Sequence, residues 1–138
     1  MVLVLVLTHG NLADELLTAA CNIDPHLADG SSAISLPWDV NYDEATRQLK
    51  QALKSADGGG GVLVLTDMFG GTAANLALPF LEKDRVEVVT GVNLPMLVKL
   101  GSLRSEELSL HELALRLTEA GQKSIRVASE YLRQRSSH

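Results

Sequence analysis

Residues 2–10 read Val-Leu-Val-Leu-Val-Leu-Thr-His-Gly, and residues 62–72 read Val-Leu-Val-Leu-Thr-Asp-Met-Phe-Gly-Gly-Thr. Each stretch begins with a short apolar run and ends in polar residues and glycine, a pattern typical of a strand buried on both faces. Such strands belong to parallel sheets that helices cover on both sides. The two stretches therefore predict an α/β fold with Val2–Leu7 and Val62–Thr66 as its central strands.

Strands and helices alternate along the rest of the chain. Ala33–Leu36 and Val86–Val89 are shorter and less apolar, so we place them outside the two central strands. This alternation predicts a single flavodoxin-like, doubly wound sheet with parallel strand order 2-1-3-4. Helical spacing and capping residues predict helices over 12–23, 41–55, 73–81 and 109–121, with a short helix after Asn93.

The segment after Gly121 carries a different pattern. Ile125 and Val127 alternate with more polar neighbours, which predicts a fifth, C-terminal strand. A helix that continues through Tyr131 is the alternative.

Composition limits the class of function. A chain of 138 residues with 46% hydrophobic and 21% charged residues is typical of one soluble globular domain. The net charge of −5 argues against nucleic acid as the main partner. No apolar run approaches the roughly 18 residues of a membrane helix. The single cysteine excludes an internal disulfide and a cysteine-based zinc site, so a cytoplasmic setting is expected.

Two side chains that can do chemistry follow the central strands. His9 stands just after the first of these strands and Asp67 is at the end of the second, at the switch point where ligands bind in such sheets. A carboxylate that accepts a hydrogen bond from one imidazole nitrogen leaves the other free for nucleophilic attack. Phe69-Gly70-Gly71-Thr72 then enters a helix, and its backbone N–H groups suit an anion. Together these residues predict a phosphohistidine at His9.

The remaining candidates are weaker. His26, His111 and His138 have no comparable setting and are interpreted as surface residues, and the histidines show no metal-ligand spacing. No metal and no cofactor are therefore expected. Trp38 and Met68 could line a docking surface or simply pack.

Three segments also form a family pattern: Thr8-His9-Gly10, the run Thr66–Asn75 and the run Thr90–Leu97. In this order and at this spacing they resemble the mannose-type IIA component of the bacterial phosphoenolpyruvate:sugar phosphotransferase system (PTS). The resemblance covers nearly the whole chain and implies a single IIA domain over residues 1–138.

The resemblance implies a phosphotransferase that works through a phosphohistidine. His9 would accept a phosphoryl group from the phosphocarrier protein HPr and pass it to a IIB component, while Asp67 hydrogen-bonds His9. It also implies a homodimer in which the C-terminal strand, antiparallel, crosses to the partner's sheet. The phosphoryl group would be held by residues beside these two side chains, namely Gly10, Phe69, Gly70, Gly71 and Thr72.

Two departures bear on the resemblance. Ala73 stands where the family usually has proline, a change that should weaken the helix start only slightly. No IIB domain is present, so the acceptor would be a separate protein, through which this one would dock to a membrane permease. Two alternatives stay open: the phosphotransferase subunit of dihydroxyacetone kinase, and a regulatory phosphohistidine module not coupled to sugar transport. The residues name no sugar.

Overall fold

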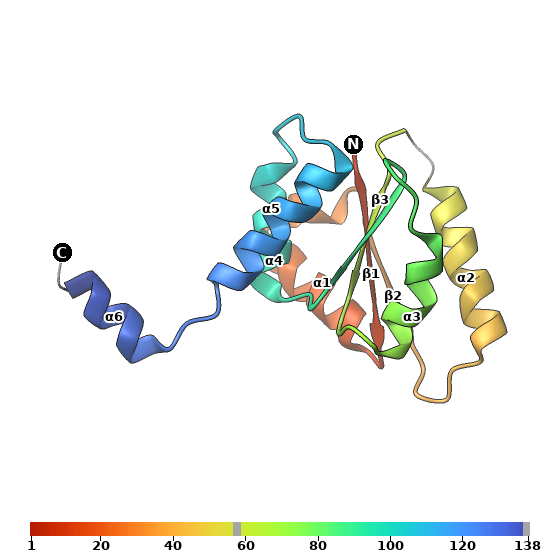
Figure 1. Cartoon of the computed structure of the whole chain (residues 1–138), viewed down its shortest axis with the longest axis horizontal. Helices are drawn as coiled ribbons and strands as arrows, with labels where there is room; N and C mark the ends of the chain where they lie inside the picture. The colour runs from red at the N-terminus through yellow and green to blue at the C-terminus, as the bar shows by residue number, and fades with distance from the viewer. Residues whose placement is uncertain (57–58, 137–138) are drawn as a thin grey trace.

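A computed structural model describes residues 1–56 and 59–136 and shows one sheet between two layers of helices (Figure 1). The four strands are all parallel and run in the order β2-β1-β3-β4, which confirms the predicted topology. The strands are β1 (Leu3–His9), β2 (Ser31–Leu36), β3 (Val62–Thr66) and β4 (Val86–Thr90).

Both faces of the central strands are buried, as their apolar runs predict. Along β1, Val4 and Val6 face one core, whereas Leu5 and Leu7 face the other. All four side chains are at most 3% exposed. The strand therefore has no solvent face, and its polar end at Thr8-His9 marks the point where the chain leaves the core.

The helices divide between the two faces of the sheet (Figure 1). On one side pack α1, α4 and α5, and on the other α2 and α3. In residues 1–56 and 59–136, no helix is both long and apolar enough to cross a membrane. The helices are α1 (Leu12–Ile23), α2 (Tyr42–Ser55), α3 (Thr72–Ala77), α4 (Leu94–Leu103), α5 (Leu110–Lys123) and α6 (Ala128–Ser136), with short 3-10 helices η1 (Pro25–Ala28) and η2 (Leu78–Phe80).

Two helix ends differ from the prediction. The helix predicted to reach Leu81 gives way at Ala77 to the 3-10 turn η2, because Pro79 has no N–H to continue the α-helical hydrogen bonds. Helix α5 continues past Gly121 to Lys123. Gly121 is a packing residue, since a Cβ there would lie 3.0 Å from the Met96 side chain of α4.

The predicted C-terminal strand is not formed in this chain. Ile125–Val127 lies outside the sheet, and a separate helix, α6, follows and projects away from the body (Figure 1). A strand needs a partner for its backbone groups, and the segment is paired with no strand of this sheet. The helix formers in Ala128–Ser136 favour α6 locally. Exchange of a strand in a dimer stays a prediction.

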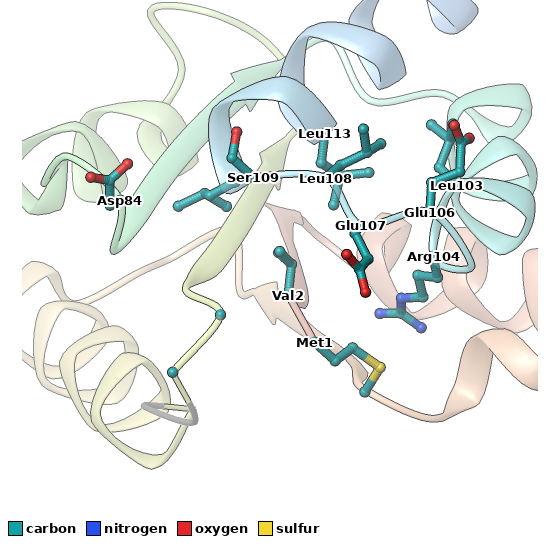
Figure 2. A pocket seen from close by; sticks show the side chains of 13 residues that line it. Met1, Val2, Asp84, Leu103, Arg104, Glu106, Glu107, Leu108, Ser109 and Leu113 are labelled. Atoms are coloured by element: carbon teal, nitrogen blue, oxygen red, sulfur yellow. The ribbon is translucent and has the colours of Figure 1, made fainter.

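A hollow lies at the amino ends of the strands (Figure 2). Figure 2 shows the side chains of Met1, Arg104 and Glu107 directed into it. The Arg104 guanidinium donates to the carbonyl oxygens of Asp29, at 2.5 Å, and Gly30, at 2.8 Å. Arg104 therefore ties the end of α4 to the start of β2.

Candidate active site

His9 and Asp67 meet at the carboxyl edge of the sheet. His9 ends β1, and Asp67 follows the last residue of β3, where Leu7 pairs with Thr66. The two side chains lie in contact, with the His9 Nδ1 atom 2.6 Å from Asp67 Oδ2. The predicted contact between these two side chains is therefore present.

Asp67 is held in place by three hydrogen bonds. Its Oδ2 accepts from the His9 ring and from the His9 backbone N–H at 2.9 Å, and its Oδ1 accepts from the Met68 N–H at 2.9 Å. Burial by itself raises the pKa of Asp67, but these hydrogen bonds and the nearby His9 ring outweigh it. The pKa of Asp67 therefore lies below its ordinary value, and the carboxylate is charged at neutral pH.

The second ring nitrogen faces a different group. The backbone N–H of Thr72 donates to His9 Nε2 at 3.3 Å. Since Nε2 accepts this bond, Nδ1 carries the ring proton and donates it to Asp67, an assignment made from the partners of the ring. His9 therefore keeps a lone pair on Nε2 as a nucleophile.

An open hollow surrounds His9. Gly10, Gly70, Gly71 and Thr72, all predicted as phosphoryl-binding residues, line it. Phe69, predicted with them, is 74% exposed and is not among the described residues that line the hollow. The full lining is His9, Gly10, Asn11, Leu12, Glu15, Trp38, Tyr42, Asp67, Met68, Gly70, Gly71, Thr72 and Asn75.

The two glycines after Phe69 have different reasons to be glycine. Gly70 has φ +83°, a left-handed conformation that favours glycine in the turn before α3. A Cβ at Gly71 would lie only 3.0 Å from the Cε1 atom of His9. The missing side chain at Gly71 is thus what lets the loop approach the imidazole edge.

The other histidines lie elsewhere. His26 is exposed, and His111 pairs with Glu87 at 3.3 Å on the far edge of the sheet. His138 falls outside the described residues. Over residues 1–56 and 59–136 there is no group of three or more His, Cys, Asp or Glu side chains that could hold a metal ion.

Sequence reasoning left the role of Trp38 open, and the structure places it against the His9 ring. Its indole stacks on the His9 imidazole, with ring centroids 5.6 Å apart and an angle of 17° between the planes. The strand order carried a signal for this contact. His9 pairs with Leu36 at the end of β2, so the residues just after Leu36 must leave the sheet beside His9.

Comparison with known proteins agrees with this architecture. The family model for the PTS system fructose IIA component matches residues 3–117. The chain is 36% identical over 135 residues to a PTS system fructose-specific EIIA component from Bacillus subtilis, covering 96% of this chain and 90% of that protein. A PTS system mannose-specific EIIAB component from Escherichia coli is 30% identical over 86% of this chain, which spans only 37% of that protein.

A solved structure gives the same result. The mannose/sorbose specific IIA subunit of the phosphotransferase system from Enterococcus faecalis superimposes with a TM-score of 0.80 at 30% identity. The match covers 91% of this chain and 92% of that one. The chain therefore belongs to the PTS fructose and mannose IIA family, whose members carry phosphoryl groups in sugar phosphotransferase systems.

Proposed function

We propose that the protein accepts a phosphoryl group from HPr on Nε2 of His9 and passes it to a IIB component. The observation that supports this proposal is that the two ring nitrogens have different hydrogen-bond partners. Nδ1 is held by Asp67 at 2.6 Å, whereas Nε2 has only the Thr72 N–H, at 3.3 Å, beside the open hollow. Nε2 is therefore the ring nitrogen that carries no proton and can attack phosphorus once the long contact with Thr72 gives way.

The proposed transfer needs only His9 and its two protein partners. The Nε2 lone pair of His9 attacks the phosphorus of phospho-HPr, a new N–P bond forms, and the donor's own bond to phosphorus breaks with its electron pair returning to HPr. The Nδ1 proton stays on the ring, and the Asp67 carboxylate stabilises the positive charge that the imidazole acquires. In the second half, the IIB nucleophile attacks phosphorus and the N–P electron pair returns to Nε2.

The loop before α3 supports the phosphoryl group. The Thr72 N–H already reaches Nε2, so once phosphorus occupies that position it can donate to a phosphoryl oxygen. Asn75 holds the loop in place by donating its Nδ2–H to the Gly70 carbonyl at 3.4 Å. The Thr72 N–H offsets the repulsion between the Asp67 carboxylate and the incoming phosphoryl oxygens.

The surroundings of His9 fit protein partners better than a small substrate. The hollow is open, and Met68 and Phe69 beside it are 59% and 74% exposed. Exposed apolar side chains next to a reactive group are typical of a docking surface. This supports HPr and a separate IIB protein as donor and acceptor, in the cytoplasm where HPr acts.

The test is incubation with phosphoenolpyruvate, enzyme I and HPr, followed by intact-mass measurement and then addition of a IIB protein. One phosphoryl group should appear on the wild type and on the His111→Ala control, and none on His9→Ala. Circular dichroism should be the same for all three, because the His9 ring lies at a strand end outside both cores.

Two results would contradict the proposal. A phosphoryl group on His9→Ala would move the acceptor to another residue. A wild type that is phosphorylated but passes nothing to any IIB protein would favour the regulatory module instead.

A further inference from the structure

The fold itself does not need Trp38. Its side chain is 81% exposed, the most exposed of the large hydrophobic side chains in the described part of the chain, and it belongs to neither core. A tryptophan so placed gains little from burial. Its one ring contact in the described residues is the stack on His9, at 5.6 Å and 17°.

The chain makes room for this stack. Gly10 has φ +56°, and a Cβ there would lie 3.1 Å from both Cζ2 and Nε1 of the indole. The Gly10 N–H donates to the Leu36 carbonyl at 2.7 Å, which fixes the start of the loop that carries Trp38. Gly10, predicted to bind phosphoryl oxygens, therefore also leaves space for the indole.

The indole completes the restraint of the His9 ring. Asp67 and the Thr72 N–H hold Nδ1 and Nε2, but both contacts lie at the ring edge, and the one to Thr72 is long at 3.3 Å. A flat group on the ring face resists rotation of the ring about its Cβ–Cγ bond. The electron-rich indole face also attracts a positively charged ring, and the imidazole becomes positive as Nε2 bonds to phosphorus.

We infer that Trp38 is a positioning residue for phosphoryl transfer: its indole holds the His9 ring so that the Nε2 lone pair points into the hollow, and it stabilises the charged ring. The inference rests on the proposed function of His9. Because the attraction is greater for the charged ring than for the neutral one, its loss slows the chemical step rather than the docking of HPr.

The kinetic test compares Trp38→Ala and Trp38→Phe with wild type in single-turnover transfer from phospho-HPr. Trp38→Ala should lower the rate at saturating phospho-HPr by about 2- to 30-fold, the range that a lost cation–π contact gives. Trp38→Phe should restore most of the rate, because phenylalanine keeps the flat face. Ile23→Ala, which removes a 57% exposed side chain at the far end of α1, is the control and should match wild type.

The alternative role, a contact with HPr alone, gives a different result. It would raise the phospho-HPr concentration needed for half-maximal rate and leave the saturating rate unchanged, and that outcome would overturn the inference. Equal rates and equal concentration dependence for Trp38→Ala and wild type would overturn it too.

A spectroscopic test does not depend on phosphorylation. Trp38 is the only tryptophan of the chain, so the indole emission reports on this stack alone. His9→Ala uncovers one indole face and should steepen the quenching of that emission by acrylamide, whereas His111→Ala should not. Unchanged quenching in His9→Ala means that no stack exists in solution and overturns the inference, even where intact mass still shows one phosphoryl group on the wild type. A wild type that takes no phosphoryl group overturns the proposed function, and the positioning role with it.

Discussion

At the scale of the residue, the charge of Asp67 is the feature that we expect to affect the proposed role of His9 most. Its Oδ2 accepts two hydrogen bonds from His9, one from the ring and one from the backbone. The backbone bond fixes the carboxylate to the end of β1 whatever the state of the ring. In the proposed transfer the ring bond is the one that changes, because the imidazole becomes positive while the carboxylate stays negative.

Asp67→Asn should therefore slow phosphoryl transfer without unfolding the protein. The amide oxygen can still accept from Nδ1, so part of the orientation survives, but the negative charge is lost. A charge-assisted hydrogen bond is about twice as strong as a neutral one, and a loss of about 1.5–3 kcal/mol in the transition state lowers the rate by about 10- to 150-fold. Single-turnover transfer from phospho-HPr measures this rate, with Asp67→Glu as a control that keeps the charge. Equal rates for Asp67→Asn and wild type would make Asp67 a structural turn residue.

At the scale of the element, the start of α4 shows what Asn93 does in the family segment Thr90–Leu97. Asn93 accepts the Met96 N–H through Oδ1 at 3.0 Å, and its Nδ2–H donates to the Gly121 carbonyl of α5 at 3.2 Å. One amide thus caps α4 and ties it to α5. Within the run Thr90–Leu97, one of the three segments of the resemblance, Asn93 thus joins two helices, and no residue of the run lines the hollow around His9.

Asn93→Ala should lower the free energy of unfolding by about 2 kcal/mol, because it removes a cap and a part-buried hydrogen bond together. Ser109→Ala is the matched control, since Ser109 only caps α5 by accepting the Glu112 N–H at 3.1 Å. Ser109→Ala should lower the free energy of unfolding by about 1 kcal/mol. Urea unfolding of both variants measures the difference, and equal losses would show that the bond to Gly121 contributes nothing.

The same elements show how far sequence alone could go. The strand order and the caps at Asn41, Asn93 and Ser109 followed from local patterns, which depend on neighbours a few residues away. The pairing of His9 with Asp67 followed because parallel strands end at one edge. For the stack of Trp38 on His9, the strand order indicates only that the loop after Leu36 starts beside His9. The position of the indole itself depends on contacts such as that with Gly10, which no periodicity encodes.

At the scale of the whole molecule, two exposed features match each other. Ile125 and Val127 are 78% and 67% exposed on a segment that leaves the body, and β4 is an edge strand. A hollow runs between β4 and α5, lined by the apolar Val88 and Leu115 among others. Unpaired strand edges and exposed apolar segments are costly to leave uncovered. We therefore propose that the C-terminal segment of one chain adds to the β4 edge of a second copy.

The full chain should then be a dimer at micromolar concentration, as measured by sedimentation equilibrium. Replacing both apolar residues, Ile125→Asp with Val127→Asp, should give monomers, because two carboxylates cannot be buried in the hollow beside β4 without a partner charge. Ser129→Asp adds one negative charge at the exposed start of α6. It controls for the presence of added charge near the segment and should stay dimeric. In an isolated chain both apolar side chains already face water, so the double variant would change nothing if the protein were monomeric. A wild type that sediments as a monomer would therefore contradict the exchange directly, and the exposed segment would need another partner.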